Sequence, residues 1–171
     1  FKKGILVSSA AHESVVQNCR VELTVTSGFP RAIYFMTAAQ DVRVVGNEVV
    51  LNLTGGPGCG GIALNGTGLA ARNRIHSVGS GRALGLELVS GGLLAANNVL
   101  EGALDYALVV YRDSHRAYHN TLIESAEYSL VRVYSNGSLR LRNNILKMEG
   151  HQFCYHIEGS IDSDYNLYHV P

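Results

Sequence analysis

The chain is poor in charged residues and in proline, and both shortages limit what it can be. Charged residues make up 16% of its 171 residues, where about a quarter is usual in a globular domain. The 14 basic residues balance the 14 acidic ones, so bulk electrostatics would recruit neither nucleic acid nor an anionic membrane. Only 3 prolines accompany 19 glycines, which favours tight bends inside a regular array over flexible linkers.

Cysteines and long apolar runs are scarce too. The three cysteines, Cys19, Cys59 and Cys154, are odd in number and match no zinc or redox motif. We interpret them as lone, partly buried thiols. No two histidines share a metal-ligand spacing on one predicted strand, so we expect neither a metal nor a cofactor. No apolar run approaches the roughly 18 residues of a membrane-spanning helix, and no apolar helical stripe with caps is present.

What the chain does contain is a repeat. The stretch "LAANNVLEG" at 94–102 is closely similar to "LRNNILKMEG" at 141–150. The repeat is marked by six asparagines at nearly even intervals: Asn47, Asn73, Asn97, Asn120, Asn143 and Asn166. All but the last precede an apolar residue by two positions. Their period falls in the range of roughly 20–30 residues that is typical of stacked repeats.

Each repeat also contains one clear strand, in the stretches "AIYF", "GIAL", "GLEL", "ALVVY", "LVRVY" and "CYHI". Apolar residues alternate there with period two, as expected for a strand with one buried face. They form one column of Ile33, Ile62, Leu86, Leu108, Val131 and Tyr155, and a second of Phe35, Leu64, Leu88, Val110, Val133 and Ile157. Ile5 and Val7 extend the columns into a less regular first coil, in which Cys19 takes the asparagine position.

One such coil cannot bury its own apolar face, but stacked coils can. Like residues then lie above like, about 4.8 Å apart, in parallel strands. Asparagine suits the corner because it tolerates left-handed backbone angles and its amide can bond to the asparagines above and below. We therefore predict an all-β, single-stranded parallel β-helix of about seven coils, forming one domain over 1–171. The glycine-rich "GGPGCGG" at 55–61 is predicted to bulge flexibly out of its coil.

At this point the chain resembles the right-handed parallel β-helix, or pectate-lyase-like, superfamily. The resemblance rests on repeats such as "GLELVSGGLLAANNVLEG", on the asparagine ladder and on the closing "DSDYNLYH" at 162–169, and it covers nearly the whole chain. It implies a right-handed coil and a secreted bacterial protein. Members of the superfamily include polysaccharide lyases, glycoside hydrolases, epimerases, phage tailspikes and surface proteins, so the fold does not determine the activity.

The catalytic signatures of that superfamily are missing. The "NTD", "DD", "GHG" and "RIK" stretches of galacturonan hydrolases are absent, as are the Asp cluster of calcium-dependent pectate lyases and the "DPH" of alginate epimerases. No phosphate-binding loop, nucleophile elbow or "HExxH" is present either. The chain starts at Phe1 and stops at Pro171, so it is also interpreted as a possible fragment whose catalytic coils lie upstream.

The residues between the buried ones are expected to form an exposed surface. The predicted carbohydrate-binding residues are Glu87, Arg132 and His156 in one row and a stacked pair, Tyr111 and Tyr134, in the next. Aromatic faces suit the C–H surfaces of sugars, and an arginine would suit a uronic acid. In a lyase, His156 would be the base, Arg132 the cation and Tyr134 the acid. In the plainer interpretation these side chains only solvate an exposed sheet.

The densest polar stretch is "YRDSHRAYHN" at 111–120. Arg112, Asp113, His115 and Arg116 are predicted to lie on or beside a turn. An Arg112–Asp113 or Asp113–Arg116 pair there would contribute at most ~1 kcal/mol. The alternative is that the stretch forms one wall of a groove, because loops on a rigid scaffold often carry function.

These observations favour a secreted bacterial β-helix domain, extracellular or at the cell surface, that contacts polysaccharide through an exposed parallel sheet without catalysis. One alternative is a polysaccharide lyase or related carbohydrate-active enzyme, and another is a structural or adhesive stalk. The expected partner is a polysaccharide or glycan, with no nucleic acid and no membrane. Self-association, end to end or side by side, is a further option because a parallel stack has two open ends.

Overall fold

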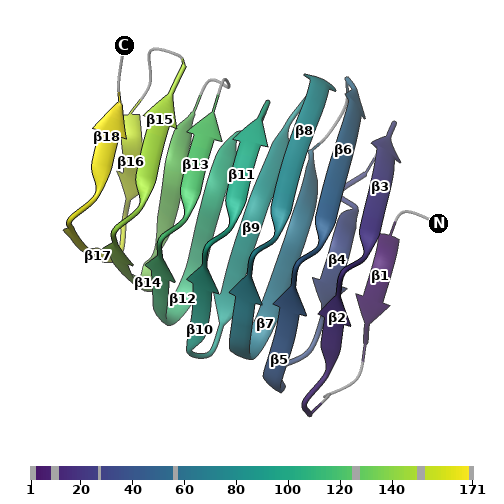
Figure 1. Ribbon diagram of the computed structural model, residues 1–171, viewed down its shortest axis with the longest axis horizontal. Coiled ribbons are helices and arrows are strands. Elements are labelled where there is room, and N and C mark those ends of the chain that lie inside the picture. The colour runs from purple at the N-terminus through teal and green to yellow at the C-terminus, as the bar shows by residue number, and fades with distance from the viewer. Residues whose placement is uncertain are drawn as a thin grey trace.

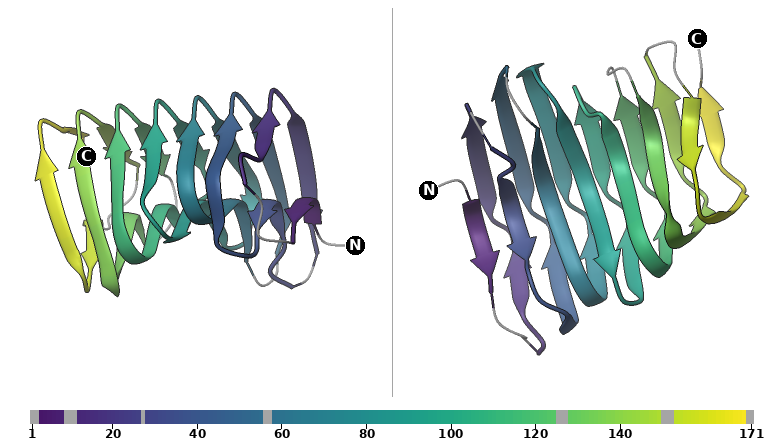
Figure 2. Two further views of the ribbon diagram at one scale, coloured as in Figure 1. Left: turned by 90° about the horizontal axis from the view of Figure 1, so that it is seen from below. Right: turned by 180° about the vertical axis from the view of Figure 1, so that it is seen from behind.

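The chain winds into a stack of parallel β-coils. The computed structural model describes residues 3–8, 12–26, 28–55, 58–124, 128–149 and 153–169, and within these ranges it contains strands and no helix. The strands form one sheet of 11 strands and one of 7, which enclose the core between them (Figures 1 and 2). The predicted parallel β-helix is confirmed, with about six turns.

In chain order the strands are β1 (Lys3–Val7), β2 (Val15–Gln17), β3 (Arg20–Val25), β4 (Arg31–Phe35), β5 (Ala39–Val45), β6 (Glu48–Thr54), β7 (Cys59–Ala71), β8 (Arg74–Ser80), β9 (Ala83–Ser90), β10 (Leu93–Ala96), β11 (Val99–Gly102), β12 (Tyr106–Tyr118), β13 (Thr121–Glu124), β14 (Ser129–Arg142), β15 (Ile145–Met148), β16 (Phe153–Ile157), β17 (Ser160–Asp164) and β18 (Leu167–His169).

The large sheet bends, and the bend divides it into two faces. The long strands β7, β12 and β14 run through the bend. Before it they pair with β4, β9 and β16, and after it with β5, β10 and β17. We call the part before the bend the first face and the part after it the second face. The 7-stranded sheet takes one strand from each coil, β3, β6, β8, β11, β13, β15 and β18, so its seven rungs are joined by about six turns.

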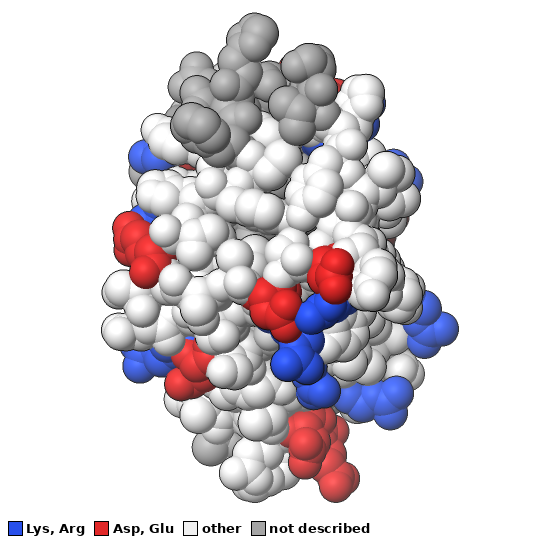
Figure 3. Space-filling model, turned by 90° about the vertical axis from the view of Figure 1, so that its left-hand side faces the viewer, with Lys and Arg blue, Asp and Glu red and all other residues white. Residues whose placement is uncertain are grey.

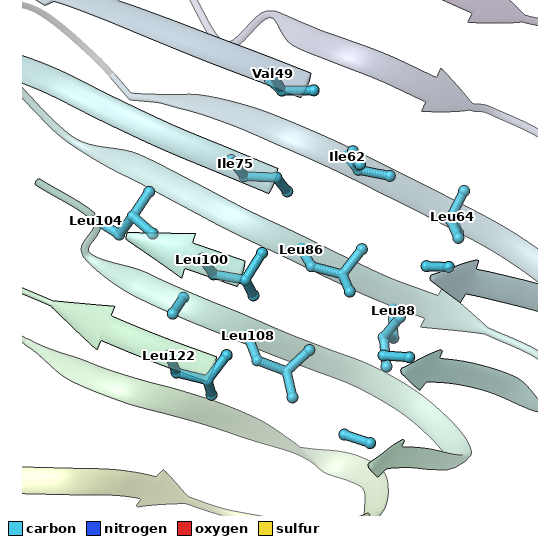
Figure 4. Packing of buried hydrophobic residues seen from close by; sticks show 14 of the residues in the cluster. Val49, Ile62, Leu64, Ile75, Leu86, Leu88, Leu100, Leu104, Leu108 and Leu122 are labelled. Carbon is cyan, nitrogen blue, oxygen red and sulfur yellow. The ribbon is translucent and has the colours of Figure 1, made fainter. Parts of the chain in front are cut away.

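The apolar columns predicted from the sequence pack as predicted. Ile33 pairs with Ile62, which pairs with Leu86, and the column continues through Leu108 to Val131. These side chains point inward and meet those of the 7-stranded sheet, among them Val49, Ile75, Leu100 and Leu122 (Figure 4). Complete burial of such a side chain contributes about 1.5–3 kcal/mol. The coils are therefore held together chiefly by this continuous interior.

A ladder of asparagines runs along one corner of the stack. The Nδ2 of each donates to Oδ1 of the next over 2.9–3.0 Å, through Asn47, Asn73, Asn98, Asn120, Asn144 and Asn166. The backbone N–H of Cys19 donates to Asn47 Oδ1 over 3.0 Å, so Cys19 does take the ladder position in the first coil. The predicted ladder is confirmed, but two of its predicted members, Asn97 and Asn143, are wrong.

Asn97 and Asn143 lie one position before the ladder and have a different role. Both are exposed and have φ near +55°, a left-handed conformation that asparagine tolerates. They turn the chain, and Asn98 and Asn144 then bond inside it. The same left-handed position is filled by other residue types in other coils, among them His119. The structure thus separates two properties of asparagine that the sequence analysis had assigned to one site.

The glycine-rich stretch does not bulge out of its coil where the structure describes it. Cys59, Gly60 and Gly61 are the first residues of β7 and all three are buried. Residues 56 and 57 lie outside the described ranges. The stretch at 58–61 instead brings the backbone of β7 close to its neighbours: a Cβ on Gly61 would lie 2.8 Å from the carbonyl oxygen of Gly85.

Candidate functional site

The row of residues predicted to face solvent aligns in register but is largely buried. Across the first face, consecutive members pair in the order Tyr34, Ala63, Glu87, Val109, Arg132 and His156. Glu87 is 1% exposed and Arg132 is 7% exposed. His156, at the C-terminal end of the row, is exposed. The expectation that the whole row meets solvent is therefore wrong for its central members.

Two tyrosine rings cover this row. Tyr111 and Tyr134 stack with their centroids 5.0 Å apart and their planes within 6°, which confirms the predicted stacked pair. The Tyr111 hydroxyl donates to Glu87 Oε2 over 3.0 Å. The guanidinium carbon of Arg132 lies 4.6 Å from the Tyr134 ring centroid. Because both rings contact the charged members of the row, they shield it from solvent.

Glu87 is held by an arginine that the sequence analysis missed. Arg31 donates to Glu87 through Nε and Nη2, each over 2.8 Å. The two residues lie on β4 and β9, with β7 between them. Gly60 makes this possible, because a Cβ at that position would lie 2.3 Å from Glu87 Oε1. The carboxylate of Glu87 thus receives three hydrogen bonds, two from Arg31 and one from Tyr111.

Burial raises the pKa of two groups in and beside this cluster. Burial, and then the negative charge of Glu87, raise the pKa of Tyr111 well above its usual value. Burial also raises the pKa of the neighbouring Cys59 thiol to about 12. Tyr111 and Cys59 are therefore uncharged at neutral pH. The cluster offers fixed rings and hydrogen bonds rather than a reactive acid or nucleophile.

Arg132 is only partly satisfied. Its Nη2 donates to Glu158 Oε1 over 2.5 Å. Its Nε and Nη1 are buried and have no hydrogen-bond partner within the described part of the chain. The face of Tyr134 compensates some of this loss, since a cation over a ring is attracted to it. Arg132 is therefore a covered cation beneath the stacked tyrosines, next to the exposed His156.

The stacked tyrosines border a hollow of about 210 Å³ on the first face. We call it the sheet hollow. It is lined by Phe29, Arg31, Gly58, Arg82, Ala83, Leu84, Asp105, Tyr106, Tyr111 and Tyr134. Three tyrosines, two arginines and one carboxylate thus converge on a single depression. Of the five predicted site residues, only Tyr111 and Tyr134 line it.

A second hollow, of about 420 Å³, adjoins the sheet hollow at the edge where the chain enters the first face. We call it the loop hollow, and it is lined by Gly79, Ser80, Gly81, Arg82, Ala103, Asp105 and Tyr128. Arg82 Nε donates to Asp105 Oδ2 over 2.9 Å. The same guanidinium lies 5.1 Å from the Tyr128 centroid, and Tyr128 is 5.8 Å from Tyr106.

The coil period brings these missed residues together. Asp105 lies one coil after Arg82 in the sequence, and Tyr128 lies one coil after Tyr106. Tyr111 and Tyr134 are likewise separated by a single coil. The same counting that predicted the stacked pair could therefore have found the others. They were missed because they precede the apolar columns and lie where the regular alternation begins.

The polar stretch at 111–120 contains the bend of β12: Asp113 has a φ of +64°, and Arg112, Asp113 and Arg116 are exposed, as a solvated turn requires. Most of it belongs to β12, and Asp113 accepts a hydrogen bond of 2.8 Å from the backbone N–H of Gly91. His115 points into the stack and is 1% exposed. Together with Ser114, Arg116, Ser138, Arg140 and other residues it lines a third hollow, of about 460 Å³, on the second face. The stretch thus combines an exposed bend at Arg112 and Asp113 with one side of a hollow after the bend, so each of the two predictions describes part of it.

Several charged side chains elsewhere form ion pairs with each other. Near the third hollow, Arg142 contacts Asp162 and Asp164 at 2.7 Å, and Arg140 contacts Asp162 at 3.2 Å. Figure 3 views the end of the stack where β16, β17 and β18 lie, and most of that face is uncharged, with acidic and basic groups side by side in places. No face seen there has the single-sign charge that would attract a polyanion.

The part of the chain that the structure describes holds neither a metal-binding cluster nor a membrane-spanning helix. Within the described ranges, no group of three or more His, Cys, Asp or Glu side chains is placed to hold a metal ion. Those ranges also include no helix of the length and apolar character needed to cross a membrane. No model of a known family matches the chain, and no curated protein or solved structure matches it.

Proposed function

We propose that this solenoid binds a polysaccharide or glycan through the first face and does not itself catalyse a reaction. The observation that carries the proposal is the convergence of Tyr106, Tyr111 and Tyr134 with Arg31, Arg82 and Asp105 on the sheet hollow. Ring faces of tyrosine pack against apolar surfaces, and their hydroxyls remain available to polar partners. Arginine and carboxylate groups nearby supply donors and acceptors for sugar hydroxyls.

The proposal keeps the resemblance to the right-handed, pectate-lyase-like β-helices, and with it an extracellular or surface location in a bacterium. The parallel coil and the buried asparagine ladder support the resemblance, and the location is proposed from the resemblance alone. The chain has a net charge of zero and few charged residues, so bulk electrostatics would not attract its partner. A glycan can be bound through local contacts without such attraction.

Binding is favoured over lyase chemistry because the three candidate catalytic residues do not meet at an open site. The side chain of Arg132 is only 9% exposed and its Nη2 is bonded to Glu158. Tyr134 stacks on Tyr111, while His156 is exposed on the neighbouring strand. A base and a cation must face the same reacting atom to act together. Arg132 lies next to His156, but its guanidinium is covered by Tyr134 and bonded to Glu158 instead of facing an open site.

A glycan array tests the proposal. The wild-type protein is expected to bind at least one polysaccharide, and Tyr134→Ala is expected to weaken that binding by about tenfold, the factor that corresponds to about 1.4 kcal/mol. Tyr165→Asn is the control, because Tyr165 is 76% exposed at a left-handed corner that asparagine accepts. No binding to any glycan would favour the structural stalk instead. Release of unsaturated uronic products, detected by ultraviolet absorbance, would favour the lyase.

A further inference from the structure

The sheet hollow and the loop hollow share two residues. Arg82 and Asp105 line both, so the ion pair between them forms the boundary at which the hollows meet. Asp105 is 7% exposed, whereas the side chain of Arg82 is 57% exposed. The boundary is therefore a buried carboxylate with a solvent-facing guanidinium above it.

The boundary is held in place before any ligand arrives. Asp105 fixes Arg82 Nε from one side, and the ring of Tyr128 lies 5.1 Å from the guanidinium on the other. A side chain already fixed in its bound position loses little conformational freedom on binding, which favours affinity. Arg82 can therefore present its remaining N–H groups to a ligand that lies across the pair.

The sizes of the hollows indicate the length of such a ligand. Small-molecule sites usually have volumes of about 300–1,000 Å³. The sheet hollow, at about 210 Å³, is below that range, and the loop hollow is about 420 Å³. Each has its own aromatic wall, Tyr111 with Tyr134 in the first and Tyr128, which is 39% exposed, in the second. Two small hollows, each with an aromatic wall, suit two linked sugar rings better than a single sugar.

We propose that the two hollows are neighbouring subsites for one sugar chain, which crosses the Arg82–Asp105 pair and places successive residues against the tyrosine pair and against Tyr128. The inference rests on the proposed function and adds to it that the ligand is an oligosaccharide segment rather than a single sugar. The loop hollow is thereby assigned as a binding site, with Tyr128 as its aromatic contact.

The test uses two series of defined sugars, β-1,4-linked glucose oligomers and α-1,4-linked galacturonic acid oligomers, each from the monomer to the hexamer, titrated by calorimetry. In the series that binds, wild-type affinity is expected to rise by about tenfold at the length that first fills both hollows. Tyr128→Ala is expected to abolish this rise while binding of the shorter oligomers persists. Tyr165→Asn is expected to behave as wild type.

The outcomes separate this inference from the proposed function. If Tyr134→Ala weakens binding at every length but the rise persists in Tyr128→Ala, the loop hollow is not a subsite, although the first face still binds sugar. If the wild-type protein binds neither series, the inference falls, whereas the proposed function is decided separately by the glycan array. Thermal unfolding checks that each variant is folded, and Tyr128→Leu, which removes the ring and keeps an apolar side chain, replaces Tyr128→Ala in the same titration should that variant not fold.

Discussion

The guanidinium of Arg31 donates two hydrogen bonds of 2.8 Å to the carboxylate of Glu87, although 56 residues separate them in the sequence. The side chain of Glu87 is 1% exposed and that of Arg31 is 22% exposed. A carboxylate removed from water to this degree is tolerated only when its charge is paired and its oxygens are bonded. The pair therefore joins β4 and β9, two strands of the first face that are separated by β7.

Arg31→Met should be strongly destabilising. The change removes the cation and leaves the carboxylate of Glu87 buried, with only the Tyr111 hydroxyl as a described donor. Breaking a buried pair from one side costs about 3–5 kcal/mol, and partial exposure of Arg31 places the expected loss at the lower end, about 3 kcal/mol. Urea unfolding at neutral pH measures the loss.

Arg20→Met is the matched control for that change. Its ion pair with Glu48 is exposed on both sides, at 64% and 43%, so its loss should cost at most about 1 kcal/mol. The double variant Arg31→Met/Glu87→Leu should recover part of the stability, because no charge is then left buried. Equal losses for Arg31→Met and Arg20→Met would contradict the burial of Glu87.

Asn98→Ala should damage the ladder that holds the corner of the coils. Asn98 Oδ1 accepts from the backbone N–H and the Nδ2 of Asn73, and its own Nδ2 donates to Asn120 and to the carbonyl of Ala70. Each buried polar group left without a partner costs about 1–3 kcal/mol, so the expected loss of unfolding free energy is about 3 kcal/mol or more. Denaturant unfolding is again the measurement.

The adjacent position provides the comparison. Asn97 is exposed with φ near +55°, a conformation that glycine also adopts readily. Asn97→Gly should therefore change the unfolding free energy by no more than about 0.5 kcal/mol, as surface substitutions usually do. The ladder assignment would be overturned if the variant at position 97 lost more stability than the variant at position 98.

The sequence predicted the coil well and its corner less well, for a physical reason. Strand alternation is a property of period two, so a column such as Ile62 and Leu86 can be assigned without ambiguity. In "NNV" and "NNI" two neighbouring asparagines both suit a corner, one by its backbone and one by its amide. The more even spacing of the asparagines favoured Asn97. The buried residue Leu100 lies two positions after Asn98 and would have pointed to Asn98 instead.

The surface was harder to predict than the interior. The alternation correctly indicated that the side chains of Glu87 and Arg132 point away from the core. It gave no sign that side chains at the bend would cover them. That covering depends on Tyr111, which lies where the pairing of β12 with β14 shifts between Val110 and Arg112. So small an irregularity is not visible in the sequence, since the repeat length itself varies from coil to coil. Of the residues that line the sheet hollow, the sequence therefore predicted only the tyrosine pair, and it did not predict that Glu87 and Arg132 are covered.

Arg132→Met should be far milder than Arg31→Met, although both remove an arginine from the same face. Arg132 carries two buried N–H groups with no described partner, and its ion pair is with Glu158, which is 44% exposed. Removing unsatisfied donors offsets the loss of that pair and of the contact with Tyr134. The expected change in unfolding free energy is within about 1 kcal/mol in either direction. A loss as large as that of Arg31→Met would indicate that the buried donors are satisfied.

His115 is an ionisable group inside the stack. Its Nδ1 accepts from the backbone N–H of Leu93 over 3.2 Å, and its Nε2 lies 2.6 Å from the carbonyl oxygen of Arg112. These contacts suit a neutral ring with its proton on Nε2, which donates to the carbonyl. Burial lowers the pKa of His115, although the Arg112 carbonyl and the charge of Asp113 act in the opposite direction.

Acid should therefore destabilise the protein through His115. Because the folded pKa lies below the unfolded value of 6.5, the stabilisation is fully present above pH 6.5. It is lost as the pH falls toward the folded pKa, at up to about 1.4 kcal/mol per pH unit. Denaturant unfolding between about pH 6.5 and 5 measures this slope. His115→Leu should remove the slope, whatever its effect at neutral pH, while His119→Asn, at an exposed left-handed corner, should retain it. An unchanged slope in His115→Leu would assign the acid sensitivity to another group.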